Sequence, residues 1–214
     1  KSQRAWVGPV GLLVLVFTLT LLGDDWIAAL EPGWHSTGFA LVWMTGQSVA
    51  GLSLALLGGL AHGAKAAEYG KKEQPRGIDW GNLLLAALLS WCYVAFAQFL
   101  IIWAGNLPAE ISWFTRRTEG AWSGVPLLLA VFTFLLPFGL LLSRRFKEQT
   151  SGLAVVAGLL LLGQEVYTAW LILPVAGRLS APGWLVALAL LTAGAAVFVE
   201  RYLAAISRLG RESA

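Results

Sequence analysis

Residues 82–104 read NLLLAALLSWCYVAFAQFLIIWA, a run without a single charged side chain. An α-helix rises about 1.5 Å per residue, so a helical run of this length extends for about 35 Å, enough to cross the hydrocarbon core of a bilayer, which is about 30 Å thick. The run is also apolar on every face, which is typical of a helix surrounded by lipid and by other helices. This stretch therefore predicts a helix that crosses a membrane.

The same kind of run recurs along the chain. Of the 214 residues, 57% are hydrophobic and only 13% are charged, whereas soluble domains carry about 25% charged residues. Apolar runs long enough to span a bilayer lie at residues 6–23, 38–61, 82–104, 121–143, 152–173 and 184–203. The core of a soluble protein accounts for one such run, but not for six in succession. We therefore expect an all-α integral membrane protein, with residues 1–214 forming a single transmembrane domain of about six helices.

The basic residues predict how these helices are oriented. On one side of the membrane we expect most of the 15 lysines and arginines: Lys1, Arg4, Lys65, Lys71, Lys72, Arg76, Arg144, Arg145, Lys147, Arg201, Arg208 and Arg211. Only Arg116, Arg117 and Arg178 fall on the other side. Because short cytoplasmic loops carry the excess of basic residues, both termini are expected in the cytoplasm. The net charge of +3 then reports orientation and does not indicate nucleic-acid binding.

Residues that bind redox cofactors are scarce. His35 and His62 lie at opposite ends of the second span, so they are not expected to hold one haem together. Cys92 is the only cysteine and lies within the third span, which argues against a covalently attached haem or an iron–sulfur cluster. We expect no metal and no redox cofactor bound by this chain, so that any redox centres belong to partner subunits.

Four polar residues within the spans, Gln47, Gln98, Gln164 and Glu165, are candidates for function, because an unpaired polar group in lipid is costly. Glu165 is the only carboxylate well inside a span, and it fits either a proton relay or quinone head-group contact, or a hydrogen bond between helices. Gln98 shares a helix face with Trp91, seven residues earlier, which favours a position at a helix interface. Both readings of Glu165 stay open from the sequence.

Small residues and prolines indicate how the helices pack. Gly51, Ala55 and Gly59 recur at four-residue spacing in the second span, which predicts a face where a neighbouring helix approaches closely. Pro126 and Pro137 remove backbone donors from the fourth span, so we expect this helix to be kinked.

The two loops expected on the periplasmic side are the most distinctive segments. The first, residues 23–37, reads GDDWIAALEPGWHST and contains Asp24, Asp25, Glu31 and His35. Tryptophans such as Trp26 and Trp34 commonly anchor helix ends at the membrane interface, whereas three acids and a histidine in so short a segment point to a further role.

The second loop follows the third span. Asn106 and Pro108 are expected to end that span, and Glu110 is expected to form ion pairs with Arg116 and Arg117. An anchored helix end and a functional site are both compatible with this pattern.

These two segments together carry a family resemblance. DWIAALEPGWHST at residues 25–37 and FAQFLIIWAGNLPAEISWFTRR at residues 96–117 resemble a membrane subunit of alternative complex III, the ActF type, which is related to the NrfD-like membrane subunits of polysulfide reductases. SRR at residues 143–145 also fits. The resemblance covers essentially the whole chain but only the later, six-helix part of the family. In the fifth span this sequence reads GQEVYTAWLILP, with Gln164 and Glu165 where the family tends to place a histidine and an aspartate.

The resemblance implies a respiratory complex in the inner membrane of a bacterium that oxidises quinol near the periplasmic face. The expected partners are a quinol-binding NrfD-like subunit and subunits that carry haem c and iron–sulfur clusters. This chain would be a non-catalytic scaffold that also lines a proton path. The candidates for contact with quinone or protons are Gln98, Glu110, Glu165, Asp25 and His35. The candidates for partner docking are Trp34, Asn106, Trp113, Arg116 and Arg117.

Two alternative functions remain compatible with the residues. The chain could bind quinone and take part in electron transfer by itself, which would place the head group near Gln98, Trp91 and Glu110. It could instead be a small transporter with Glu165 as the coupling acid. The transporter is the less favoured of the two, because the sequence shows no convincing internal repeat of the kind common in that class.

Overall fold

The computed structural model describes residues 2–31, 33–34, 36–68 and 77–176, and this part of the chain is helical without any strand. The α-helices are α1 (Ser2–Leu22), α2 (Phe39–Glu68), α3 (Gly77–Gly105), α4 (Pro108–Thr118), α5 (Val125–Leu129), α6 (Leu136–Leu142), α7 (Arg144–Glu148) and α8 (Thr150–Ala176). Short π-helical turns are η1 (Gly23–Ile27) and η4 (Ala130–Leu135), and 3₁₀ turns are η2 (Ala28–Leu30) and η3 (Gly120–Trp122).

Five helical segments are long and apolar enough to cross a membrane. They are Gly8–Leu30, Phe39–Leu60, Gly77–Gly105, Val125–Leu142 and Thr150–Val175. They coincide with the first five apolar runs of the sequence, so the expectation of a multi-pass helical membrane protein is confirmed for this part of the chain. The sixth predicted span, residues 184–203, and Arg178 lie outside the described residues.

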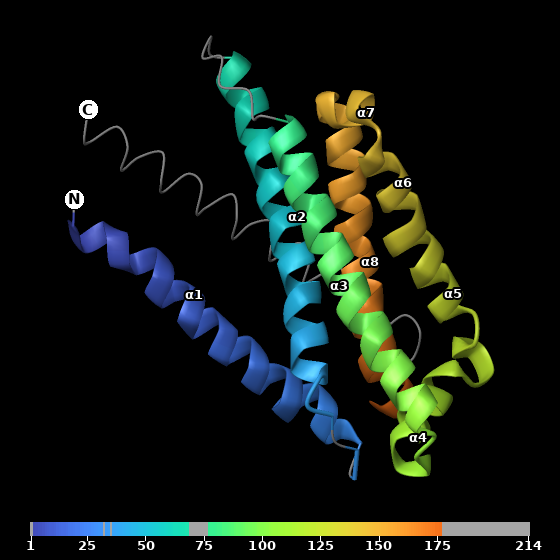
Figure 1. Cartoon of the computed structure of the whole chain (residues 1–214). Coiled ribbons are helices and arrows are strands. Elements are labelled where there is room, and N and C mark those ends of the chain that lie inside the picture. Colours follow the sequence, from blue (N-terminus) through green and yellow to red (C-terminus); the bar gives the residue numbers. More distant parts are fainter. Residues whose placement is uncertain (1, 32, 35, 69–76, 177–214) are drawn as a thin grey trace.

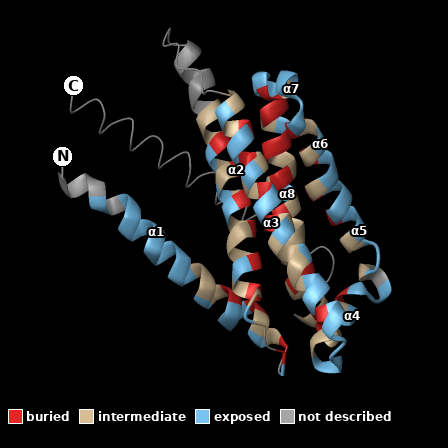
Figure 2. Ribbon diagram, viewed as in Figure 1, coloured by how far each residue is buried: buried red, intermediate tan, exposed pale blue. Residues whose placement is uncertain are grey.

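The core of the bundle lies between α2, α3 and α8, with α5, η4 and α6 packed against α8 (Figure 1). Fully buried aliphatic side chains fill it: Val49 and Leu56 on α2, Leu84 and Leu88 on α3, Leu141 on α6, and Leu153, Val156 and Leu160 on α8. Figure 2 shows buried residues along α2 and α8, whereas most of α1 is exposed. We call the end of the bundle at which α4 and residues 23–38 lie the α4 end.

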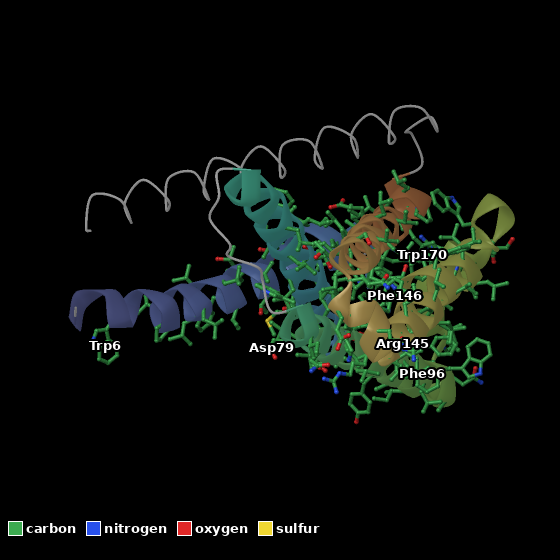
Figure 3. All side chains as sticks on the ribbon, turned by 90° about the horizontal axis from the view of Figure 1, so that it is seen from above. Trp6, Asp79, Phe96, Arg145, Phe146 and Trp170 are labelled. Carbon is green, nitrogen blue, oxygen red and sulfur yellow. The ribbon has the colours of Figure 1, made fainter. Side chains whose placement is uncertain are left out.

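Helix α1 diverges from the rest of the bundle. It meets α2 only at the α4 end, and its N-terminal half extends away from the other helices (Figure 1). The view from above places Trp6 far from Phe146 and Trp170 (Figure 3), and the Trp6 side chain is 72% exposed.

The first span is longer than the sequence predicted. It does not end at residue 23 but continues through η1 and η2 to Leu30, so Asp24 and Asp25 lie on a helical turn rather than in a loop. Both aspartates are exposed. The first residue of the extension, Gly23, lies against the ring of Trp43 on α2, where a Cβ atom would be 3.2 Å from the ring.

The fourth span is irregular, as its prolines predicted. Pro126 lies in the first turn of α5 and Pro137 in the first turn of α6, and the π-helical segment η4 separates the two helices. A proline cannot donate a backbone hydrogen bond, so a local change of helical register before Pro137 accommodates the missing donor. Within η4, Thr133 is buried and lies directly against Gly163 of α8.

Gly51, Ala55 and Gly59, which were expected to face a neighbouring helix, do not form a close helix contact among the described residues. In the structure, Gly51 and Ala55 are exposed, and a Cβ atom at Gly51 or Gly59 would meet nothing within 4 Å. Close approach occurs instead at Gly46, where a Cβ would lie 2.8 Å from Gln164 Oε1 on α8 and 3.2 Å from Trp91 Nε1 on α3. The regular spacing therefore marks an exposed face of α2 within the described part of the chain.

Candidate functional site

Two segments far apart in the sequence meet at the α4 end. Glu31 follows the extension of the first span, and Arg117 lies in the last turn of α4. Their side chains are 4% and 0% exposed and form an ion pair with 3.0 Å between Arg117 Nη1 and Glu31 Oε2. The other carboxylate oxygen of Glu31, Oε1, lies 3.2 Å from Nε of the exposed Arg116. The segments that carry the family resemblance are thus joined by a buried charge pair.

The Arg117 side chain is anchored on several sides. Its Nε donates to the carbonyl oxygen of Leu171 on α8 (3.0 Å), its Nη1 donates to the carbonyl oxygen of Trp113 (2.9 Å), and its guanidinium lies 3.3 Å from the centre of the Trp113 ring. The Trp170 indole donates to the carbonyl oxygen of Arg117 (2.8 Å). Burial lowers the pKa of Arg117, and the hydrogen bond and charge of Glu31 act in the opposite direction. Arginine stays protonated under ordinary conditions, so its guanidinium is a fixed positive charge that links α4, α8 and the end of the first span.

Aromatic rings close the same cluster. Trp34 stacks on Trp113 with ring centres 3.9 Å apart, and Phe39 contacts both rings edge-on. Both tryptophans are buried. Trp34 therefore packs inside the protein and does not serve as the interface anchor that its position suggested, whereas Trp26 is 71% exposed and suits that role.

A cavity of about 940 Å³ opens beside this cluster. One wall comes from the segment between the first span and α2, including Glu31, Trp34 and Ser36. The opposite wall is formed by residues 93–102 of α3, and Glu110 at the start of α4 also borders the cavity. Its surface is mainly apolar with a few polar groups, which is typical of a site for a small molecule.

Gln98 connects the two walls. Its Nε2 donates to Ser36 Oγ (3.2 Å), so the glutamine within the apolar run joins α3 to the segment before α2. The partner lies in the non-helical segment before α2, so this contact differs from the interface between two helices that the shared face with Trp91 predicted. Gln98 Oε1 and Trp34 Nε1 are buried and have no hydrogen-bond partner among the described residues.

The other candidate residues are placed as follows. Glu110 is half-buried in the cavity wall, and Asp25 is exposed on η1 outside it. Glu165 is half-buried on α8 and does not border the cavity. Asn106 is exposed at the end of α3 with a positive φ of 49°, which asparagine tolerates better than most residues. His35 lies outside the described residues.

One sequence expectation about this site was wrong. Arg116 and Arg117 pair with Glu31 and not with Glu110. Glu110 is at the first turn of α4 and the arginines are at its last turn, about two turns apart, which is too far for the spacing of side-chain pairs on a helix. Trp34, Trp113 and Arg117 have internal contacts, so partner docking stays a prediction that concerns chiefly the exposed Asn106 and Arg116.

Gln164, one of the polar residues noted within the predicted spans, lies in the bundle core. Gln164 is 2% exposed, and its Nε2 has no partner among the described residues. Gln164 and Trp91 both lie close to Gly46, and Trp91 contacts Tyr167 edge-on.

No group of three or more histidine, cysteine, aspartate or glutamate side chains suited to a metal ion occurs in the described ranges.

Comparison of the chain with models of protein families gave no match, and comparison with curated proteins gave none either. The α4 end therefore combines two features. One is the buried contact of Glu31, Arg117 and the stacked tryptophans, and the other is an open, mainly apolar cavity beside it.

Proposed function

We propose that this chain is an integral membrane subunit of a respiratory quinol-oxidising complex of the alternative complex III type. In this role it is a scaffold in a bacterial inner membrane, without its own redox cofactor. Quinol-binding, haem c and iron–sulfur subunits are its partners, and α8 with Glu165 borders a proton path. One observation carries the proposal: residues 25–37 and 96–117, the segments that resemble this family, converge at the α4 end.

The geometry supports a scaffold in particular. The buried ion pair of Glu31 with Arg117 and the stacked rings of Trp34 and Trp113 fix the relative positions of the first span, α4 and α8. The exposed residues around this joint, Asn106 and Arg116, are presented on a rigid base. A rigid surface of this kind binds a partner without paying much ordering entropy.

The proposal is tested by purification of the tagged chain from its native membrane in a mild detergent. We expect haem c and iron–sulfur subunits to co-purify with it, and identification by mass spectrometry with haem absorption would measure this. The double variant Asn106→Ala with Arg116→Ala should reduce the yield of these partners while the chain itself stays folded. Arg144→Ala, on an exposed residue at the opposite end of the bundle, is the matched control and should retain the partners. A chain that purifies alone and transports a solute in vesicles would contradict the proposal.

A further inference from the structure

Two polar side chains lie on the same side of the pair formed by α2 and α8. Gly46 of α2 faces α8, because a Cβ atom there would be 2.8 Å from Gln164 Oε1. The next residue of each helix, Gln47 or Glu165, is turned by about 100° from this contact. Because α2 begins and α8 ends at the α4 end (Figure 1), the two helices are antiparallel. The two turns therefore carry Gln47 and Glu165 to one side of the pair.

Helix α3 occupies the other side of the pair. Trp91 of α3 also lies against Gly46, and Val49 and Leu160 belong to the core cluster that α2 and α8 share with α3. Val49 follows Gly46 by three residues, which turns it by about 60° in the direction opposite to Gln47. The side of Gln47 is therefore the side away from α3.

This outer side has polar groups but no described neighbour to satisfy them. Leu54 follows Gln47 by seven residues and Leu161 precedes Glu165 by four, so each shares the face of its polar residue. We call these four residues the α2–α8 face. Gln47 and Glu165 are half-buried, and neither side chain has a hydrogen-bond partner in the described part of the chain. Because an unpaired polar group within a membrane span is costly, a cover that supplies hydrogen bonds is favoured here.

The chain has a segment that can reach this face. Helix α8 ends at Ala176, and a linker of seven residues, 177–183, connects it to the apolar run 184–203. Seven extended residues reach about 23–25 Å, whereas the axes of packed helices are about 8–10 Å apart. Consecutive elements are usually neighbours, and α2, α3 and the fourth span already contact α8 on its other sides. The α2–α8 face is thus the free position next to α8.

The polar groups of the face and of the apolar run also match in depth. Residues 184–199 read WLVALALLTAGAAVFV, in which Thr192 is the only polar side chain away from the end. Thr192 is eight residues from the start of the run, Gln47 is eight from the start of α2, and Glu165 is eleven from the end of α8. At 1.5 Å per residue these depths are about 12, 12 and 16 Å, which agree within one helical turn. The small residues 193–196 also allow a neighbouring helix to approach closely.

We propose that residues 184–203 cross the membrane along the α2–α8 face and place Thr192 between Gln47 and Glu165. The Thr192 hydroxyl donates to a carboxyl oxygen of Glu165 and accepts from the amide of Gln47, since a hydroxyl group can do both. Three spans then satisfy one another's polar groups inside the bundle. The inference concerns the packing of this chain alone and holds whether or not the chain belongs to a larger complex.

Disulfide crosslinking of the purified full chain in lipid nanodiscs tests this packing. In a Cys92→Ala background, Leu54→Cys is combined with a single cysteine at each of residues 194–199, and copper phenanthroline is the oxidant. We expect crosslinks within the monomer at positions three or four residues apart, because a disulfide requires Cα atoms within about 7 Å. A non-reducing gel and mass spectrometry of the linked peptides measure this.

Leucines at a similar depth on two other helices provide the controls. Leu89 on α3 and Leu15 on α1 are 43% and 52% exposed, and Leu89→Cys or Leu15→Cys should crosslink less than Leu54→Cys with the same partners. Stronger crosslinking of either control would overturn the proposal. Crosslinks found only between two copies of the chain would assign the face to a second copy instead, and no crosslink in protein that is folded by circular dichroism would also exclude the packing.

A second measurement tests the hydrogen bonds of Thr192. Thr192→Val should lower the midpoint of thermal unfolding by about 2–4 °C. The matched control is Thr20→Val on α1, where the hydroxyl donates to the carbonyl oxygen of Val16 in its own helix (2.8 Å), and the expected change is less than about 1 °C. When Gln47→Leu and Glu165→Leu are already present, Thr192→Val should have no further effect. An equal loss in both backgrounds would contradict the assigned contact.

Discussion

Arg117 and Arg144 both pair with a glutamate at close to 3 Å, but in opposite environments. The pair of Arg117 with Glu31 is 0% and 4% exposed, whereas the pair of Arg144 with Glu148 is 80% and 52% exposed. Water screens the exposed pair, and such pairs contribute about 0–1 kcal/mol. Loss of one partner of a buried pair leaves an uncompensated charge, which is far more costly. Burial, and not contact distance, decides which arginine matters for stability.

We predict that Arg117→Met destabilises the protein by about 3–5 kcal/mol, because it removes the buried partner of Glu31 and leaves only the exposed Arg116 beside that carboxylate. Arg144→Met should change the free energy of unfolding by less than about 1 kcal/mol. Denaturation of the purified protein in detergent, followed by circular dichroism, measures both. The double variant Glu31→Gln with Arg117→Met should cost clearly less than the sum of the single variants. Additive losses would show that the two side chains are not energetically coupled.

The sequence allowed prediction of the residue types at this site but not of their pairing. Arg116 and Arg117 fall on the side expected to carry few basic residues, and an acidic partner was expected for them. Glu110, in the first turn of the same helix, was the expected partner. The actual partner, Glu31, is 86 positions away, and only the packing of α4 against α8 and the first span brings it close. Pairing between distant segments depends on tertiary structure, which one sequence does not encode in any local pattern.

At the scale of the helices, close packing depends on single glycines that face a specific neighbour. Gly46 lies between α3 and α8, Gly81 lies against the side chain of Lys147 on α7, and Gly163 lies against Thr133 on η4. The regular stripe of Gly51, Ala55 and Gly59 suggested an interface that the described helices do not form. Five spans and the irregular fourth helix were predictable, because length, hydropathy and proline content are local properties. The faces in contact were not, because each depends on how neighbouring helices cross.

We predict that Gly46→Ala destabilises the bundle by about 1–3 kcal/mol, because the new methyl group would crowd Gln164 and Trp91. Gly51→Ala on the same helix meets no described atom within 4 Å and should be neutral or stabilising by up to about 1 kcal/mol, since alanine is the better helix former. Thermal unfolding of the two variants in the same detergent gives the comparison. Similar losses from both would contradict the packing of α2 described above.

At the scale of the whole molecule, α1 stands out because the other described helices cover so little of its surface. From Val10 to Thr18 every residue is exposed, so no face of this stretch is covered by the described residues. The neighbours of this stretch are therefore lipid, another protein or residues outside the described part of the chain. If the chain is a subunit of a larger complex, as proposed, α1 offers an extended apolar surface to a neighbour.

We predict that spin labels placed singly at residues 10–17, in a Cys92→Ala background, are all accessible to oxygen in the isolated protein. Along α8 the accessibility should instead vary with the helical period of 3.6 residues, because one face of α8 is buried. In the purified complex, one face of α1 should lose accessibility. Electron paramagnetic resonance with oxygen as the relaxing agent measures all three cases. Helical variation along α1 in the isolated protein would show that this chain covers the helix itself.

The buried pair of Glu31 with Arg117 also sets an order for biogenesis. Ribosomes add about 5–20 residues per second, so Glu31 leaves the ribosome roughly 4–17 seconds before Arg117. Arg117 in turn binds the carbonyl oxygen of Leu171, which is made later still. Throughout this interval the first span is inserted with an unpaired carboxylate at its end and without its final neighbours. Insertion of the fifth span completes the joint, so the early chain depends on water at the membrane surface, or on an insertion factor, until α8 arrives.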